Sequence, residues 1–363
     1  MYDFSFMIHP MEADDLSKKF NFTKGISSKY LEKILRFFPP FKAGTIEGIK
    51  SKCTGKEISG FFAVCPLTTR QILGLPQELV LRKIINTGRM AEKQGSMLLG
   101  LGAMTAVVGD AGLTVSKELG IPVTTGNSYT IALAMEGAKK AAKKMGIDIA
   151  QAEVAVVGAT GSIGAVCAKL MAMDCKYLTL VAQDKSKLNA LARDIIYETG
   201  QAVRITSDLK GTLKEAQIVI TVTSAMNTII EPEDLAPGSV VCDVARPRDV
   251  ARRVTEERKD VLVIEGGLAE IPGDVRSTLD MGYPENITFA CTAETMILAL
   301  EGKREGWTLG REISFNQVRE IHELGKKHGF KLAGFRSFNR KLTEEDIRLI
   351  RKNGSLPGGS NAV

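Results

Sequence analysis

The middle of the chain alternates short apolar runs with segments of helical spacing. Six runs of β-branched and aliphatic residues are bounded by turn or helix signals, which is typical of strands buried in a parallel sheet. Ile163–Met173, after the first run, has the apolar spacing of an amphipathic helix. This pattern predicts an α/β fold with a Rossmann-type doubly wound parallel sheet. The six predicted strands are Val154–Val157, Tyr177–Ala182, Ala202–Ser207, Ile218–Thr223, Ser239–Asp243 and Val261–Glu265.

The preceding residues, from about 4 to 126, follow a different pattern and predict an α/β domain of their own. Their apolar stretches alternate with polar positions or recur at helical spacing, and turn residues separate them. The predicted elements are paired strands over Thr45–Lys52 and Glu57–Cys65, a helix over Pro76–Gln94 and a strand over Ser96–Leu101.

Turn and cap signals at Thr124–Ser128 come before a long helical pattern, Tyr129–Lys144, which we expect to link two domains. After residue 286 the pattern is helical again, and the last ten residues are rich in Gly and Ser, which is typical of a disordered tail. The predicted organisation is an N-terminal α/β substrate domain (1–128), a Rossmann domain (129–285) entered through a linking helix (129–145), a C-terminal helical segment (286–353) and a tail (354–363).

Three glycines spaced three apart follow the first predicted parallel strand. Gly158 permits a tight turn, Gly161 lets a pyrophosphate approach the backbone, and Gly164 lets the following helix pack closely on the strand. This arrangement predicts a dinucleotide site, with a glycine-rich turn of another α/β protein as the alternative. The residues predicted to bind there are Gly158, Ala159, Thr160, Gly161, Ser162, Ile163 and Gly164.

The ends of the second, fourth and fifth predicted strands carry further polar residues. An acidic residue ending the second strand binds the ribose of NAD, whereas a polar or basic loop admits the extra phosphate of NADP. The signal is mixed, because Gln183 occupies the expected acidic place and Asp184 follows it. Two nearby lysines either meet a phosphate or are solvated at a helix start. The predicted cofactor-binding residues of these strand ends are Gln183, Asp184, Lys185, Lys187, Thr223, Ser224, Ala225 and Asp243.

Composition agrees with a globular protein of two domains. The chain has 363 residues, 44% hydrophobic and 25% charged, and a formal net charge of +6. Its Lys and Arg residues are spread along the chain, which argues against nucleic-acid binding. No apolar run approaches the roughly 20 residues of a membrane span, and Met1–Pro10 does not resemble a signal peptide. We therefore expect a soluble, cytoplasmic protein, with its oligomeric state left open.

Cysteine spacing draws attention to one thiol. The six cysteines form no CxxC pair and have no neighbouring histidine, so we expect neither a metal site nor a disulfide framework. Cys291 falls near the first turn of a predicted helix, where the dipole and unpaired N–H groups lower a thiol pKa and favour attack on a carbonyl. The alternative is an inert packed cysteine. Cys65, at a strand end, ranks second.

Several segments, in order and spacing, resemble the cyanobacterial long-chain acyl-[acyl-carrier-protein] reductase family. The resemblance covers about residues 45 to 335. It implies NADPH-dependent reduction of a fatty acyl thioester, carried by acyl carrier protein or coenzyme A, to an aldehyde through an acyl-enzyme on Cys291. NAD remains an alternative cofactor. The matching segments are Thr124–Asn127, Gly146–Ile149, Val154–Gly161, Gly266-Gly267, Phe289–Cys291 with Ala293-Glu294, and His328–Phe330.

The resemblance also implies supporting roles around the cysteine. Thr105, Asn127 and Ser128 are expected near the cleft between domains as donors to an oxyanion, with helix capping an equal alternative for Asn127 and Ser128. Glu294 shares a helical face with Cys291 and either orients the thiol or interacts with the helix dipole. His322 and His328 lie in a polar helix and are expected to be solvated.

The sequence departs from the family in places. Tyr129 stands where the cyanobacterial members have His, and the stretches 226–249 and 271–283 diverge, so acyl length and carrier stay open. Two other functions remain: a shikimate-dehydrogenase-like oxidoreductase on a small hydroxy or amino acid, and a nucleotide-sensing protein without chemistry. An acyl tunnel is one interpretation of an apolar set that is also typical of ordinary core: Phe61, Phe62, Leu67, Ile72 and Leu98.

Overall fold

The computed structural model describes residues 1–12, 15 and 28–355. The chain divides into two compact units, each built from two separate stretches of sequence. Unit 1 comprises residues 1–129 and 269–331, and unit 2 comprises residues 130–268 and 332–363. The predicted limits at 128 and 285 differ from this division, which groups the helix of Cys291 with the N-terminal residues; the predicted domain organisation stays a prediction.

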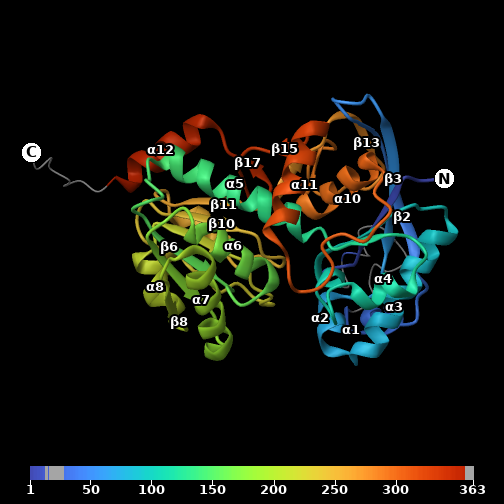
Figure 1. The fold of residues 1–363 in the computed structure, drawn as a ribbon, viewed down its shortest axis with the longest axis horizontal. Coiled ribbons are helices and arrows are strands. Elements are labelled where there is room, and N and C mark those ends of the chain that lie inside the picture. The colour runs from blue at the N-terminus through green and yellow to red at the C-terminus, as the bar shows by residue number, and fades with distance from the viewer. Residues whose placement is uncertain (13–14, 16–27, 356–363) are drawn as a thin grey trace, which may run out of the picture. The chain divides into compact units, whose positions relative to one another are not determined.

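A six-stranded mixed sheet forms the framework of unit 1, in the order β13-β2-β3-β1-β4-β5 (Figure 1). β1, β3, β4 and β5 run parallel, while β2 pairs antiparallel with both β3 and β13. The predicted pairing of strands over Thr45–Lys52 and Glu57–Cys65 is therefore confirmed. The strands are β1 (Phe4–Ile8), β2 (Phe41–Lys50), β3 (Glu57–Val64), β4 (Leu99–Leu101), β5 (Val123–Thr124) and β13 (Gly273–Ser277).

Helices pack on both faces of this sheet. On one face, Met7, Phe61 and Leu99 join a core with Val80 and Ile84 of a long helix. On the other face a helix approaches β4 so closely that a Cβ on Gly100 would overlap the Thr295 hydroxyl. The helices of unit 1 are α1 (Ser28–Leu35), α2 (Thr69–Gly74), α3 (Gln77–Lys93), the 3₁₀ turn η3 (Ala103–Ala106), α4 (Leu113–Glu118), α10 (Ala290–Glu301) and α11 (Phe315–His328).

Unit 2 contains the predicted doubly wound sheet. All six strands are parallel, in the order β11-β10-β9-β6-β7-β8. β6, the first of them in the sequence, lies near the centre. Successive strands are added on one side of β6 as far as β8 and then, from β9 onward, on its other side. This is the Rossmann order, and ligands bind such sheets at the carboxyl ends beside the reversal. The strands are β6 (Glu153–Val157), β7 (Tyr177–Val181), β8 (Arg204–Thr206), β9 (Ile218–Thr221), β10 (Val240–Asp243) and β11 (Leu262–Glu265).

Alternation along the strands of unit 2 divides its core between two faces. Val157, Val219 and Val241 pack on one face with Leu213 of α8. Cys242, the next residue of β10, points to the other face, where its Sγ lies 3.7 Å from the carbonyl oxygen of Ala134. Helices thus cover both faces, as a buried parallel sheet requires. The helices are α5 (Asn127–Met145), which begins in unit 1, α6 (Ser162–Ala172), α7 (Lys185–Thr199), α8 (Leu209–Glu215), η4 (Pro232–Asp234), α9 (Arg253–Glu257) and α12 (Glu344–Gly354).

The C-terminal part differs from the predicted helical pattern, because short strands interrupt it. The strand predicted at Ser96–Leu101 is also shorter: it is β4, with Ser96 joined to Tyr2 by an isolated bridge. The predicted tail begins at Gly354, the last residue of α12, and residues 356–363 lie outside the described residues. The additional strands are β12 (Leu268–Glu270), β14 (Ile287–Phe289), β15 (Lys331–Leu332), β16 (Arg336–Ser337) and β17 (Arg340–Lys341).

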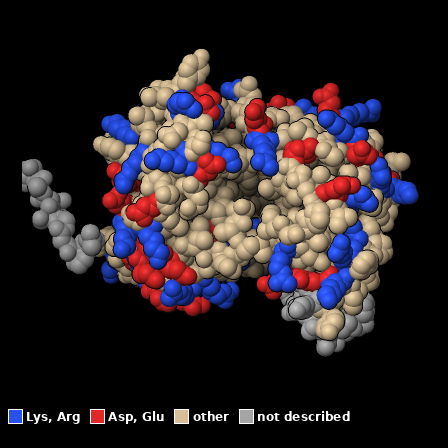
Figure 2. Space-filling model, turned by 90° about the horizontal axis from the view of Figure 1, so that it is seen from below, with Lys and Arg blue, Asp and Glu red and all other residues tan. Residues whose placement is uncertain are grey.

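The surface carries charges of both signs. Figure 2 shows Lys and Arg side chains interspersed with Asp and Glu on the face in view. Within the described residues, no helix has the length and apolar composition needed to span a membrane.

Candidate functional site

The glycine turn of unit 2 has the geometry of an anion-binding helix start. Gly158 has φ +79°, and a Cβ there would lie 2.7 Å from the carbonyl oxygen of Val222. A Cβ on Gly164 would overlap the Gly158 carbonyl, so the helix packs directly on the turn. Gly161 is different, because its nearest neighbour at the Cβ position is the Gly158 oxygen at 3.4 Å and its outer side is exposed.

Gly161 also serves as the N-cap of α6 and supplies no side-chain hydrogen bond to the first turn. The first N–H groups of α6 therefore lack a side-chain cap, which suits them to bind an anion. An open glycine and an uncapped helix start together fit a dinucleotide pyrophosphate. Ala159 is buried beneath the turn, while Thr160, Ser162 and Ile163 are partly exposed around it.

The residues after β7 lie exposed at the start of α7. Asp184 is the N-cap of α7, where it accepts the Lys187 N–H at 3.0 Å. That hydrogen bond lowers the pKa of Asp184. Gln183, Lys185 and Lys187 are exposed, and the Lys187 ammonium lies 3.4 Å from Asp184. The predicted choice between a ribose-binding acid and a phosphate-binding lysine stays open.

A buried carboxylate organises the end of β9. The hydroxyls of Thr221 and Thr223 each donate to the Asp249 carboxylate at 2.5 Å, and the Thr223 N–H donates to the same carboxylate at 3.0 Å. Thr223 in turn accepts the Ala225 N–H at 3.1 Å, and Ser224 is exposed. The predicted cofactor segment Thr223–Ala225 is thus fixed by Asp249, a residue that sequence reasoning did not single out.

Asp243, at the end of β10, holds the next loop. Its carboxylate accepts the N–H groups of Ala245 and Val250 at 3.0 and 3.2 Å. Burial raises its pKa to about 6, against the lowering effect of nearby Arg246. A carboxyl group with this pKa titrates near neutral pH at the carboxyl edge of the sheet, where ligands bind in open α/β folds.

Cys291 lies in the first turn of α10, as predicted. Phe289 is the N-cap and makes no side-chain hydrogen bond to the helix. Gly126, with φ +75°, packs on Cys291 so tightly that a Cβ would overlap the Cα and Cβ of the cysteine. The predicted turn Thr124–Asn127 and the predicted nucleophile are therefore in direct contact within unit 1.

The expectation of a lowered thiol pKa is wrong for this structure. Burial raises the pKa of Cys291 to about 11, although the N–H and hydroxyl of Thr292 act in the lowering direction. Cys291 is nevertheless partly exposed. Burial also raises the pKa of Cys65, the second-ranked thiol, to about 12, and Cys65 belongs to the core of unit 1.

Glu294 is fully buried and joins α10 to the start of α5. Its carboxylate accepts hydrogen bonds from four donors and makes no direct bond to Cys291 among those that the structure gives. Burial raises the pKa of Glu294, opposed by these bonds. Two of these donors lie at the N-terminus of α5, and both predicted roles of Glu294, orienting the thiol and interacting with its own helix dipole, stay predictions. The donors are the hydroxyls of Thr124 (2.5 Å), Ser128 (2.7 Å) and Thr308 (3.0 Å) and the N–H of Tyr129 (2.8 Å).

The three predicted oxyanion donors differ in what they already bind. The Thr105 hydroxyl donates to the Gly102 carbonyl at 2.7 Å. The Ser128 hydroxyl donates to Glu294 and accepts the Trp307 indole N–H at 3.2 Å. Asn127 is the first residue of α5, adjacent to Gly126, and no hydrogen bond of its amide is given for the described part of the chain. The roles of all three residues as oxyanion donors stay predictions.

Two buried histidines have both ring nitrogens occupied. His9, which sequence reasoning passed over, accepts the Met104 N–H at Nε2 (3.2 Å) and donates from Nδ1 to the Pro10 carbonyl (3.0 Å). His328, predicted to be solvated, is buried between Ser51 at 2.8 Å and Glu301 at 2.6 Å. His322 on the same helix is partly exposed.

The contacts of His328 also fix α10. Glu301 is the last residue of α10, and Lys56 donates to the carbonyls of Ala299 and Leu300 at 2.9 and 3.1 Å. The β2–β3 hairpin thus holds the C-terminus of the helix whose N-terminus carries Cys291. A cation at this end also complements the helix dipole.

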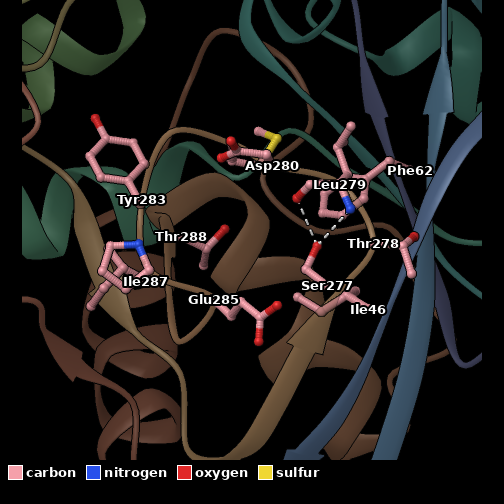
Figure 3. A pocket seen from close by; sticks show the side chains of 12 residues that line it. Ile46, Phe62, Ser277, Thr278, Leu279, Asp280, Tyr283, Glu285, Ile287 and Thr288 are labelled. Carbon is pink, nitrogen blue, oxygen red and sulfur yellow. Dashed lines mark hydrogen bonds between the residues drawn. The ribbon is translucent and has the colours of Figure 1, made fainter. Parts of the chain in front are cut away.

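A pocket of about 250 Å³ lies beside the segment that leads into α10. Figure 3 shows Phe62 and Ile46 on one side of it and the loop from Ser277 to Thr288 around it. The Ser277 hydroxyl is held by the Leu279 carbonyl and N–H at 2.9 and 3.2 Å. Of the predicted tunnel residues, only Phe62 lines this pocket.

The other members of that tunnel set are core residues. Phe61, Leu67 and Ile72 belong to the core of unit 1 between the sheet and α3, and Leu98 is also buried. The pocket instead forms from residues 277–288, part of which lies in the stretch where the sequence diverges from the family. Alternating or helical periodicity does not mark a loop of this kind, so the sequence held no signal for it.

Comparison with known proteins places the chain among oxidoreductase-like folds. The Shikimate / quinate 5-dehydrogenase family model matches residues 139–265, which include the glycine turn and all six parallel strands. The crystal structure of L-tryptophan dehydrogenase from Nostoc punctiforme superposes over 96% of this chain and 87% of its own, with 11% identity and a TM-score of 0.43. The chain is an α/β protein with the NAD(P)-binding architecture of oxidoreductases.

Two curated relatives extend over most of the chain. The aminotransferase PigE of a Serratia species is 30% identical over 306 residues, 83% of this chain and 36% of PigE. The chain thus spans about a third of the length of that relative. The long-chain acyl-[acyl-carrier-protein] reductase of Synechococcus elongatus is 29% identical over 335 residues, 88% of this chain and 94% of the reductase. The chain is homologous to this reductase over nearly its whole length.

Proposed function

We propose that the protein is an NAD(P)H-dependent reductase that converts an acyl thioester to an aldehyde through an acyl-enzyme on Cys291. The observation that carries the proposal is the contact between Gly126 and Cys291 at the start of α10. It joins two segments that lie more than 150 residues apart and that both belong to the sequence resemblance to the reductase family. The dinucleotide-binding architecture of unit 2 supports a redox reaction.

The first proposed step transfers the acyl group from the carrier thiol to Cys291. The Cys291 sulfur attacks the thioester carbonyl, a new carbon–sulfur bond forms, and the carrier thiolate leaves and takes a proton from water. The Asn127 amide and the N–H groups at the start of α10 are the donors best suited to the negative charge on the carbonyl oxygen. Overall, one acyl thioester, one reduced dinucleotide and one proton give one aldehyde, one carrier thiol and one oxidised dinucleotide.

The residues of unit 2 would hold the dinucleotide. Gly161 and the first N–H groups of α6 would bind its pyrophosphate, and the Thr223–Ala225 segment would bind near its nicotinamide ribose. When bound, the reduced nicotinamide supplies the hydride that releases the acyl group as aldehyde. We assign NADP as the preferred form because Gln183 occupies the place expected of a ribose-binding acid, and Lys185 and Lys187 are exposed nearby.

The substrate would enter beside α10. The pocket lined by Phe62, Leu279 and Thr288 lies next to Phe289 in the chain, two residues before Cys291. It combines apolar side chains with hydroxyl and carboxylate groups, and we assign it to the acyl portion of the thioester. Coenzyme A and acyl carrier protein both present the same thioester, so either is a candidate carrier.

Intact-mass measurement tests the acyl-enzyme directly. Incubation with acyl-CoA and no dinucleotide is expected to add one acyl group to the wild-type chain and none to the Cys291→Ala variant. Cys53→Ser is the matched control, because Cys53 is exposed and its loss is expected to leave the adduct intact. Absence of the adduct, together with NADP+-dependent oxidation of a small hydroxy acid, would identify a shikimate-dehydrogenase-like enzyme instead.

A further inference from the structure

The hydroxyl group of Thr292 is buried without a partner beside the cysteine. Thr292 is 0% exposed, and its Oγ1 makes no hydrogen bond to any residue that the structure describes. A buried hydroxyl without a partner destabilises a folded protein, so each such case calls for an explanation. Other hydroxyls nearby are satisfied: Thr295 binds the Cys291 carbonyl at 3.2 Å and Thr308 binds Glu294 at 3.0 Å.

The position of Thr292 in α10 explains why it lacks a helical partner. A threonine inside a helix bonds the carbonyl four residues earlier. For Thr292 that residue is Thr288, which lies in β14, before the helix begins. Thr292 is the third residue of α10 and therefore belongs to the first turn, whose N–H groups receive no hydrogen bond from a capping side chain.

Cys291, the candidate nucleophile, directly precedes Thr292 in the first turn of α10. Both the N–H and the hydroxyl of Thr292 favour the charged form of that thiol. Among the described residues, the buried His9 and His328 have both ring nitrogens engaged in other hydrogen bonds. Glu294 is saturated by donors from Thr124 to Thr308.

We propose that the Thr292 hydroxyl is the hydrogen-bond donor that stabilises the Cys291 thiolate. The thiol loses its proton to solvent, while Thr292 keeps its own proton and donates it to the sulfur. The role of that thiolate as a nucleophile toward thioesters rests on the proposed function. The donor role itself is a property of the free protein and is measurable without any substrate.

The test compares thiol reactivity in matched variants of the full chain, all carrying Cys53→Ser to remove the exposed competing thiol. The probe is iodoacetamide, followed at Cys291 by peptide mass spectrometry between pH 7 and 10. Because a hydrogen bond to a charged group shifts such an equilibrium by about one order of magnitude or more, Thr292→Val is expected to slow alkylation at least about tenfold at each pH. Thr295→Val removes an equally buried hydroxyl one turn further along and is expected to leave the rate unchanged.

Thr292→Ser keeps the hydroxyl and is expected to keep the rate within about threefold, and it remains informative if the valine variant does not fold. An unchanged rate in Thr292→Val, or a tenfold loss in Thr292→Ser, would overturn the proposal. A second readout, acylation by acyl-CoA, separates the two proposals. If alkylation depends on Thr292 while no acyl adduct forms in any variant, the thiolate donor stands and the reductase function fails.

Discussion

Replacing Gly126 by alanine tests the contact on which the proposed site depends. Gly126 has φ +75°, and an added Cβ would overlap Cys291 Cα and Cβ and lie 2.8 Å from the Cys291 carbonyl oxygen. These are backbone or near-backbone atoms of a helix start, so they cannot move aside as a flexible side chain does. Gly55 is a matched control in the same unit, because it has φ +70° and nothing within 4 Å of its Cβ position.

The two substitutions share one cost and differ in another. Placing alanine in the left-handed region costs about 1 kcal/mol of unfolding free energy at both sites. Forcing an extra carbon into a packed position costs about a further 1–3 kcal/mol, and this applies to Gly126 alone. The expected difference between Gly126→Ala and Gly55→Ala is therefore about 1–3 kcal/mol.

The single tryptophan supplies the assay. Trp307 is the only tryptophan of the chain, and its indole donates to Ser128 in unit 1. Its fluorescence in a urea titration therefore reports the unfolding of the unit that holds Cys291. Equal midpoints for the two variants would refute the close contact, and so would an unchanged rate of Cys291 alkylation in Gly126→Ala.

Three further predictions address the remaining parts of the site. Gly161→Val is expected to weaken dinucleotide binding at least about tenfold, because it fills the space at the start of α6; unchanged affinity in a fluorescence titration would exclude this site. Asp243 has its pKa raised to about 6, so its neutral form adds stability at low pH that is lost as the pH rises through 6. Asp243→Asn is therefore expected to gain up to about 3 kcal/mol over wild type between pH 4 and 7 in urea titrations, and a constant difference would contradict this. Leu279→Trp is expected to raise KM for acyl thioesters several-fold while Cys291 alkylation by iodoacetamide stays normal; an unchanged KM would remove the pocket from the substrate path.

The sequence pattern predicted the parallel sheet of unit 2 well, because its strands and its glycine turn are each defined by residues that are close together in the sequence. Each parallel strand is a short apolar run, and the glycines that follow the first strand indicate where the next helix begins. The start of α10 at Ala290 was also predictable, since Phe289–Glu294 opens an apolar helical pattern. The mixed sheet of unit 1 was only partly predictable, because β13 pairs with β2 across more than 220 residues.

The surroundings of the cysteine were not predictable in the same way. The donors to Glu294 come from segments about 14 and 165 to 170 residues away. The direction of the Cys291 pKa depends on how much protein surrounds the sulfur, which no position along a helix reveals. The prediction that His328 is solvated was wrong for a similar reason. Its helix is polar along the sequence, but this residue is buried against Ser51 and Glu301, which lie far from it in the chain.

The order of synthesis gives the discontinuous make-up of unit 1 a further meaning. The six parallel strands end at Glu265, so all of them are synthesised before α10. Unit 1 cannot complete its sheet until β13 arrives to pair with β2, or present its cysteine until Ala290–Glu301 follows. A nascent chain that stalls near Leu268 therefore contains the sequence of all six parallel strands but no Cys291. Because domains fold as units while the chain grows, the thiol joins unit 1 only after the whole sequence of the parallel sheet has been made.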